Sequence, residues 1–141
     1  MGLDMYLYAS YCIYENELSK NISQFFPALS GSLVTKVRAQ IGYWRKSYMI
    51  HAWFVKHVQE GVDNCDEYYV SKEELKELLE TVNEVLGDHS KAPTLLKIPQ
   101  SLFGTPSYDD GYFEDLEETK QIIEKALLLP EDWDITYQSS W

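Results

Sequence analysis

The sequence YWRKSYMIHAWFVKHV, residues 43–58, decides which fold we expect, because no other stretch is as dense in aromatic, cationic and histidine side chains. At 100° per residue, positions three and four apart from Trp44 fall within about 40° of one another, which predicts one helix. Its core-facing side would hold Trp44, Tyr48, His51, Val55 and Val58. The opposite side would hold Arg45, Met49, Trp53 and Lys56. Because apolar or aromatic residues thus lie almost all round the helix, we expect a central helix that is contacted on two sides.

The segments around this helix predict a small α+β fold. Three segments alternate apolar and polar residues and are predicted as strands: 3–9, 33–43 and 133–137. A fourth, short strand is considered at 68–70. A capping box from Ser71 to Glu74 predicts the start of an amphipathic helix that Gly87 can end. Acids at its start and an apolar stripe predict a third helix over 108–129. We therefore expect one α+β domain over 1–141, with an antiparallel or mixed sheet of three to four strands and three helices.

Two connections carry weaker signals. The pattern over 15–29 is compatible with a short helix ending near Pro27 but is too weak to count among the three. The polar connection 89–106, punctuated by Pro and Gly, is long enough to be functional and is our candidate for a lid.

Charge is distributed unevenly along the chain. The formal net charge is -11, with 12 Lys and Arg against 23 Asp and Glu. Residues 1–60 carry +2, so the remaining residues carry -13. Between Leu18 and Gln59 there are six cations and no Asp or Glu, which is unusual in so acidic a chain. The total charge disfavours direct binding to DNA, and the acid-free window is where we expect a negatively charged ligand.

Composition limits the cellular context and the kinds of site that we expect. Cys12 and Cys65 are the two cysteines, and neither lies in a metal-ligand spacing, which is typical of reduced thiols in a cytosolic protein. No run of 18 apolar residues occurs, so we expect no membrane association. We assign no cofactor, no metal ligand and no catalytic residue from the sequence, and we expect a cytoplasmic location.

Several blocks of the sequence together resemble a known family. They are GLDMYLY near the start, YWRK followed by IHAWFV and QEGVDNC, the late LFGTPSYDDGYFEDLEET, and the terminal YQSSW. In these sequence blocks the chain is similar to a family of small proteins carried by bacteriophages and prophages, which has no settled activity. The resemblance covers most of the chain. It implies an accessory phage protein that acts in the cytoplasm of a bacterial host, where counter-defence is a common task.

Cations and aromatics of the acid-free window form the predicted ligand site. An Arg fork suits phosphate, and aromatic rings can stack on a base. The predicted ligand-binding residues are Arg38, Trp44, Arg45, Lys46, Trp53, Lys56, Tyr108 and Tyr112. They predict a binding protein that sequesters a phosphorylated, nucleotide-like molecule. The alternative interpretation is that these cations pair with the acidic remainder of the chain, within the domain or between subunits.

Two other functions stay open at this point. The acidic segments 66–86 and 107–125 can present a nucleic-acid-like surface that inhibits a basic host protein. A small hydrolase would use His51 or the late carboxylates, although His51 on the predicted core stripe is more simply a hydrogen-bonded core histidine. The number of aromatic side chains also makes a homodimer plausible.

Overall fold

Within residues 2–100 and 106–141, which are the residues that the computed structural model describes, the chain is built on a four-stranded antiparallel sheet. Its strand order is β2-β1-β4-β3. The strands are β1 (Asp4–Cys12), β2 (Lys36–Arg45), β3 (Tyr68–Tyr69) and β4 (Asp134–Ser140). Along β1 the residues Met5, Leu7 and Ala9 are buried and those between them are partly exposed. This is the period of two that the sequence predicts, and it gives the sheet one core face and one open face.

The helices confirm the α+β class but not the predicted number. The described ranges contain five α-helices and two short 3-10 turns. They are α1 (Asn16–Ser23), α2 (Tyr48–His57), α3 (Lys72–Gly87), α4 (Ala92–Leu95), α5 (Asp110–Leu127), η1 (Pro27–Leu29) and η2 (His89–Lys91). The prediction of three helices is wrong because α1 gives only the weak signal over 15–29 that was not counted, and the four residues of α4 are too few to show a helical period. The predicted capping box is present, with the Ser71 hydroxyl accepting from the Glu74 amide at 3.1 Å.

The predicted central helix over 43–58 is wrong in its first turn. Residues 43–45 complete β2, which pairs with β1 as far as the partners Asp4 and Arg45. Lys46 then adopts a left-handed conformation with φ of 58°, and α2 begins at Tyr48. Counting a helical period from Trp44 across this turn therefore misplaced Tyr48, Met49 and Trp53, whereas His51 is buried as predicted. Its buried residues are Met49, Ile50, His51, Trp53 and Phe54, while Tyr48 is 46% exposed.

A bulge in β2 decides which side chains share the open face. Leu7 pairs with Gly42 and Tyr8 pairs with Gln40, so Ile41 is an extra residue on the β2 side. Arg38 and Arg45 are seven residues apart, and an uninterrupted strand would place them on opposite faces. With the extra residue, both side chains lie on the open face, opposite Ser10 and Asp4 of β1.

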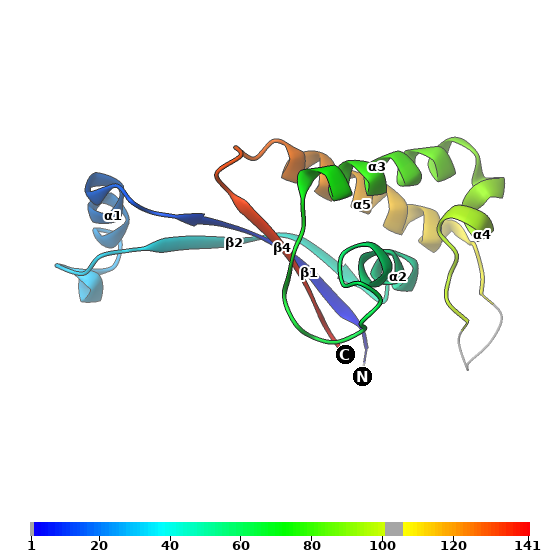
Figure 1. Ribbon diagram of the computed structural model, residues 1–141, viewed down its shortest axis with the longest axis horizontal. Coiled ribbons are helices and arrows are strands. Elements are labelled where there is room, and N and C mark those ends of the chain that lie inside the picture. Colours follow the sequence, from blue (N-terminus) through cyan, green and yellow to red (C-terminus); the bar gives the residue numbers. More distant parts are fainter. Residues whose placement is uncertain (1, 101–105) are drawn as a thin grey trace.

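The core lies between the other face of the sheet and the helices. Trp44 of β2 donates its indole N–H to the Thr119 hydroxyl of α5 at 2.8 Å, which joins sheet and helix. Phe54 of α2 stacks on Tyr137 of β4, with ring centroids 3.9 Å apart. In Figure 1, α3 and α5 lie side by side, and α2 is drawn below them. We call this part of the molecule the body.

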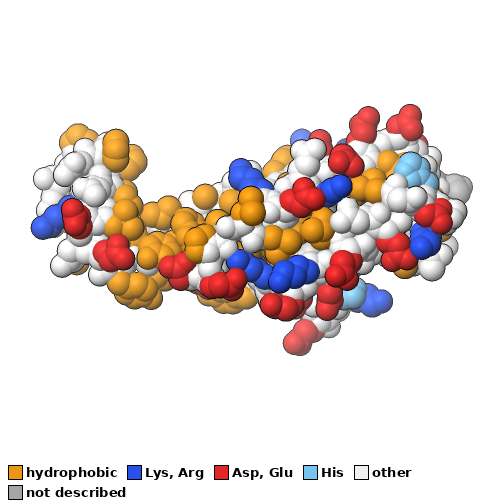
Figure 2. Space-filling model, turned by 90° about the horizontal axis from the view of Figure 1, so that it is seen from above, with side chains coloured by type: hydrophobic (Ala, Val, Ile, Leu, Met, Phe, Trp, Pro, Cys, Tyr) orange, Lys and Arg blue, Asp and Glu red, His pale blue; other side chains and the backbone are white. Residues whose placement is uncertain are grey.

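A long hairpin arm projects from the body. β4 pairs with β1 from Asp4 to Ser10, whereas β1 and β2 run further and carry residues 13–35 at their end. We call residues 13–35 the lobe, and Figure 1 shows it at the opposite end of the molecule from α4. In Figure 2, hydrophobic side chains gather along the arm and lobe, while acidic side chains are most frequent over the body.

Candidate functional site

Three adjoining hollows follow the exposed side of α2, and together we call them the α2 groove. The first hollow has a volume of about 230 Å³ and is lined by Leu3, Tyr48, His51, Asp63 and Trp141. The second hollow, of about 430 Å³, shares Tyr48, His51 and Asp63 with the first. The third hollow, of about 200 Å³, shares Ala52 and Lys56 with the second. The groove therefore runs along the helix from its first turn to its last.

The end of α2 explains how the next loop comes to line this groove. Glu60 and Gly61 are both left-handed, with φ of 54° and 83°, and the Gly61 N–H donates to the Val55 carbonyl at 2.8 Å. Such a left-handed pair ends a helix and reverses the chain. The loop consequently returns over α2, and this places Asp63 beside His51.

His51 fixes the loop to the body through both of its ring nitrogens. Its Nε2 lies 2.9 Å from an Asp63 carboxylate oxygen, and its Nδ1 lies 2.7 Å from the Tyr137 hydroxyl. An ionised carboxylate can only accept, so the proton is on Nε2. In the neutral ring the Tyr137 hydroxyl therefore donates to Nδ1. Burial raises the pKa of Tyr137, which keeps that hydroxyl protonated.

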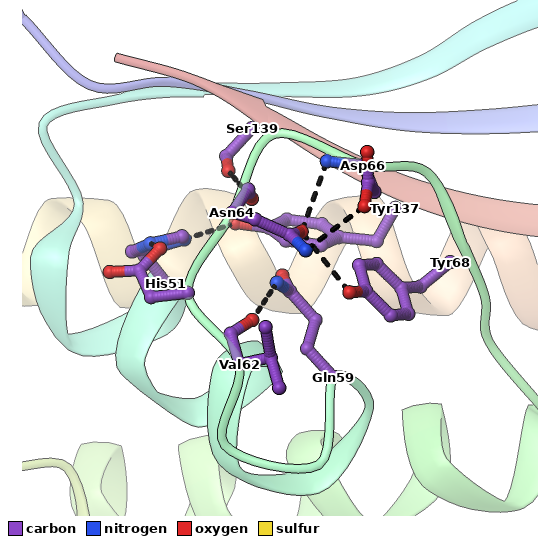
Figure 3. Close-up of polar contacts among 9 residues, drawn as sticks. His51, Gln59, Val62, Asn64, Asp66, Tyr68, Tyr137 and Ser139 are labelled. Atoms are coloured by element: carbon purple, nitrogen blue, oxygen red, sulfur yellow. Dashed lines mark hydrogen bonds and ion pairs between the residues drawn. The ribbon is translucent and has the colours of Figure 1, made fainter.

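The same loop is held by a second set of polar contacts (Figure 3). The Asn64 side-chain oxygen accepts from the Asp66 amide at 3.1 Å and from the Tyr68 hydroxyl at 3.1 Å. The Ser139 hydroxyl of β4 donates to the Asn64 carbonyl at 3.2 Å. The Gln59 side chain donates to the Val62 carbonyl at 2.7 Å and closes the turn. The wall of the groove is therefore held in place before any ligand binds.

The two ends of the groove differ in charge. The third hollow is lined by Lys56, His57 and Lys97, and no Asp or Glu is among its lining residues in the described part of the chain. The Trp53 ring stacks on His57 with centroids 4.4 Å apart, which holds the imidazole at this end. The first two hollows instead contain the Asp63 carboxylate beside Tyr48. One end thus suits an anion, and the other suits a group that donates hydrogen bonds.

The predicted cations do not meet at one point. The guanidinium of Arg38 makes two hydrogen bonds to the Glu67 carboxylate, at 2.9 and 2.6 Å, and lies 3.8 Å above the Tyr8 ring. For Arg38 the structure thus matches the ion-pair alternative. Arg45 and Lys46 lie at the far end of β2, where the Lys46 amide donates to the Leu3 carbonyl at 2.8 Å. Lys56 is the predicted cation that lines the groove.

The predicted aromatic residues mostly belong to the core. Trp44 is buried, and Trp53 is buried except where it borders the third hollow. Tyr112 is buried and donates its hydroxyl to the Leu96 carbonyl at 2.8 Å, and burial raises its pKa. The Tyr108 hydroxyl accepts from the Ile98 amide at 3.2 Å. These two tyrosines fasten the segment after α4 to α5, and residues 101–105 of the lid candidate lie outside the described residues.

Several groove residues were absent from the predicted ligand-binding set. They are Tyr48, His51, Asp63, Lys97 and Trp141. His51 and Tyr137 are 86 residues apart in the sequence, so no local spacing brings them together. Tyr48 was assigned to the core by the helical count from Trp44. Only the turn residues after α2, in EGVDN, gave a usable signal, because they predict that the chain reverses there.

Comparisons of this chain with protein-family models, with curated proteins and with solved structures find no match. Among the helices of residues 2–100 and 106–141, none is long and apolar enough to cross a lipid bilayer.

Proposed function

We propose that this protein binds a small phosphorylated molecule with a flat heterocyclic ring, such as a nucleotide, in the α2 groove. The observation that supports the proposal is the continuity of the three hollows along α2, with lysines at one end and Tyr48 with Asp63 at the other. Tyr48 and Lys56 are separated by about 12 Å along the helix axis. A mononucleotide can span that length, with its base at Tyr48 and its phosphate at Lys56.

The phosphate end is proposed to be the third hollow. The ammonium groups of Lys56 and Lys97 can both donate to phosphate oxygens, and His57 adds a third donor. Hydrogen bonds to charged groups contribute about 1.5–3 kcal/mol each, so two lysines give an appreciable part of the binding free energy.

The base end is proposed to be the pair of hollows around Tyr48. Tyr48 and Trp141 are half-exposed, so each has ring surface on which a base can stack. His51 hydrogen-bonds one oxygen of the Asp63 carboxylate, and within residues 2–100 and 106–141 the other oxygen has no hydrogen-bond partner, so it can accept from ring or amino N–H groups. This arrangement favours a base whose edge carries donors over one whose edge carries acceptors.

Catalysis receives less support than binding. Both nitrogens of His51 are engaged, and Tyr137 is buried with a raised pKa. Neither side chain is placed to take a proton from a substrate. His51 is therefore best described as a positioning residue for Asp63. A binding protein of this kind would act by lowering the free concentration of its ligand, which agrees with the counter-defence role implied by the resemblance to phage proteins.

Calorimetric titration with a panel of purine and pyrimidine mono-, di- and cyclic nucleotides tests this proposal. We expect at least one to bind, and we expect the double variant Lys56→Ala, Lys97→Ala to weaken that binding by about 10- to 100-fold. The matched control is Lys76→Ala, Lys125→Ala, which removes two exposed lysines from α3 and α5 and should leave affinity unchanged. No binding across the panel, or equal losses in both variants, would contradict the proposal.

A second function is favoured by the charge of the body. α3 and α5 pack side by side, and their exposed outer faces carry most of their acids. We propose, as the alternative, that this acidic surface binds a basic protein. A pull-down from a bacterial lysate should then recover one basic protein. The recovered amount should fall at high salt, and the double variant Glu77→Lys, Glu80→Lys should recover none. If neither high salt nor the charge reversal changed the recovered amount, this alternative would be ruled out.

A further inference from the structure

The lobe exposes more apolar side-chain surface than a solvated hairpin end requires. Tyr14 is 87% exposed, Phe25 is 80% exposed and Leu33 is 70% exposed, and Phe26 and Leu29 are also exposed. So much exposed apolar surface within one short segment is of the kind that marks protein interfaces, and we call these five side chains the patch. In Figures 1 and 2 the lobe stands apart from the body, so no helix of the body lies over it.

The lobe is nevertheless a folded unit and not a loose turn. The Ile13 amide donates to the Thr35 carbonyl at 2.8 Å and closes its base. The Val34 amide donates to the Ser19 hydroxyl at 2.7 Å, which fastens the returning chain to α1. The patch is thus held in a fixed arrangement before any partner binds, which lowers the entropy cost of association.

We propose that the lobe is a dimer interface, and that its occupant is the lobe of a second copy of this chain. Charge is the first argument for this choice. The lobe holds Glu15, Glu17 and Lys20, a net charge of -1 within a chain of -11. Two copies that meet at their lobes keep their acidic bodies at opposite ends of the pair. This arrangement minimises the repulsion between two strongly acidic proteins.

The available area is the second argument. Given their exposed fractions and typical side-chain areas, the five side chains present on the order of 600 Å² per copy. A symmetric pair that buried all of this surface would bury about 1,200 Å², which is the lower limit of a stable, specific interface. The lobe also contains a hollow of about 520 Å³ between α1 and η1, bordered by Lys20 and Pro27. Serine and glutamine side chains also line this hollow, and none of the five apolar side chains does, so it supplies polar surface within the same lobe.

Sedimentation equilibrium measures the dimer directly. We expect the wild-type protein to dimerise at micromolar concentration. The variant Phe25→Ser, Leu33→Ser should raise the dissociation constant by at least about 100-fold. The matched control, Val62→Ser, Leu128→Ser, removes two other exposed apolar side chains, one in the loop after α2 and one after α5, and should leave the dimer unchanged. Circular dichroism should show that both variants stay folded. A wild-type monomer at all concentrations, or a dimer that survives in the lobe variant, would overturn the proposal.

Spin-label distances test where the two copies meet. With Cys12 and Cys65 replaced by Ser, a single label is placed either at Asn21 of α1 or at Asn83 of α3, both of which are exposed. The proposal expects a short distance between the two Asn21 labels and a much longer one between the two Asn83 labels. The reverse order would place the interface on the body and overturn it.

Salt supplies an independent readout. Because the proposed contact is apolar and the two copies repel each other, added salt should screen the repulsion and lower the dissociation constant. A dimer held by opposite charges would weaken with salt, so a rise in the dissociation constant would contradict this interface.

Discussion

The body and the lobe use the same residue type in opposite ways. Phe54 in the body is fully buried and stacks on Tyr137 at 3.9 Å, whereas Phe25 in the lobe is 80% exposed. The body surrounds its aromatic core with acids, and the lobe carries three charged residues in total. Aromatic content therefore has two meanings in this chain: in the body it stabilises the fold, and in the lobe it offers a surface to another molecule.

The largest effect on stability is expected in a comparison of two variants, Phe54→Ala in the body and Phe25→Ala in the lobe. Removing the buried ring leaves a cavity and should lower the free energy of unfolding by about 3–5 kcal/mol. Removing the exposed ring should change it by less than about 0.5 kcal/mol in the monomer. Urea unfolding at a concentration too low for dimers measures both.

The outcome that would break the comparison is a large loss of stability in Phe25→Ala. It would mean that the lobe ring packs within its own chain. A similar change in Phe26→Ala, which removes the neighbouring and less exposed ring, would point the same way.

The approximate positions of the strands were predictable because their signal is local, although β2 spans 36–45 where 33–43 was predicted. The alternation around Met5 and Leu7 is set by which face of the sheet is buried, and it is readable from the sequence itself. The turn at Lys46 was not predictable, because Trp44 and Tyr48 also fit a helical spacing and nothing in their chemistry excludes it. A left-handed Lys has no reliable sequence signature.

The site was harder to predict than the fold because it depends on contacts that are distant in sequence. The sequence indicated that Lys56 would face a ligand, and Lys56 does line the groove. Nothing local links His51 to Tyr137, or Lys56 to Lys97. The bulge at Ile41 had a similar effect, since one extra residue decides on which face Arg38 lies.

The next test compares two glycines, one buried and one exposed. A Cβ added at Gly42 would lie 2.5 Å from a methyl group of Ile122 in α5, at the contact between β2 and the body. Gly42→Ala should therefore lower the free energy of unfolding by about 1–3 kcal/mol. Gly87→Ala has no atom within 4 Å of the added methyl and should be neutral or slightly stabilising. Equal effects in thermal or urea unfolding would show that α5 does not pack closely on β2.

A third pair compares a buried hydroxyl with an exposed one. Tyr137→Phe removes the donor to His51 Nδ1 and leaves that nitrogen buried without its partner, which should cost about 1–2 kcal/mol of stability. Tyr43→Phe removes the hydrogen bond to Asp4 on the open face, where water can replace it, and should cost less. The variant Tyr137→Phe should also loosen the loop that carries Asp63, and amide hydrogen exchange at Asp63 and Asn64 should report this. Unchanged exchange would mean that the Asn64 contacts alone hold the loop.

The smallest expected effect concerns the ion pair between Arg38 of β2 and Glu67, which precedes β3. The hydrogen bond from Arg38 lowers the pKa of Glu67 below its ordinary value of 4.5 in the folded protein. A carboxylate with a lowered pKa stabilises the fold above its unfolded pKa, and this contribution disappears as the pH falls through the folded pKa. Since both side chains are about one third exposed, the pair should contribute less than about 1 kcal/mol. Urea unfolding should therefore show Glu67→Gln to be slightly less stable than wild type at pH 7, with the difference shrinking below pH 4.5 and also shrinking in high salt. A difference that persists at pH 3 would mean that Glu67 stabilises the fold through packing and not through its charge. Glu67 would then act like the buried residues of the body.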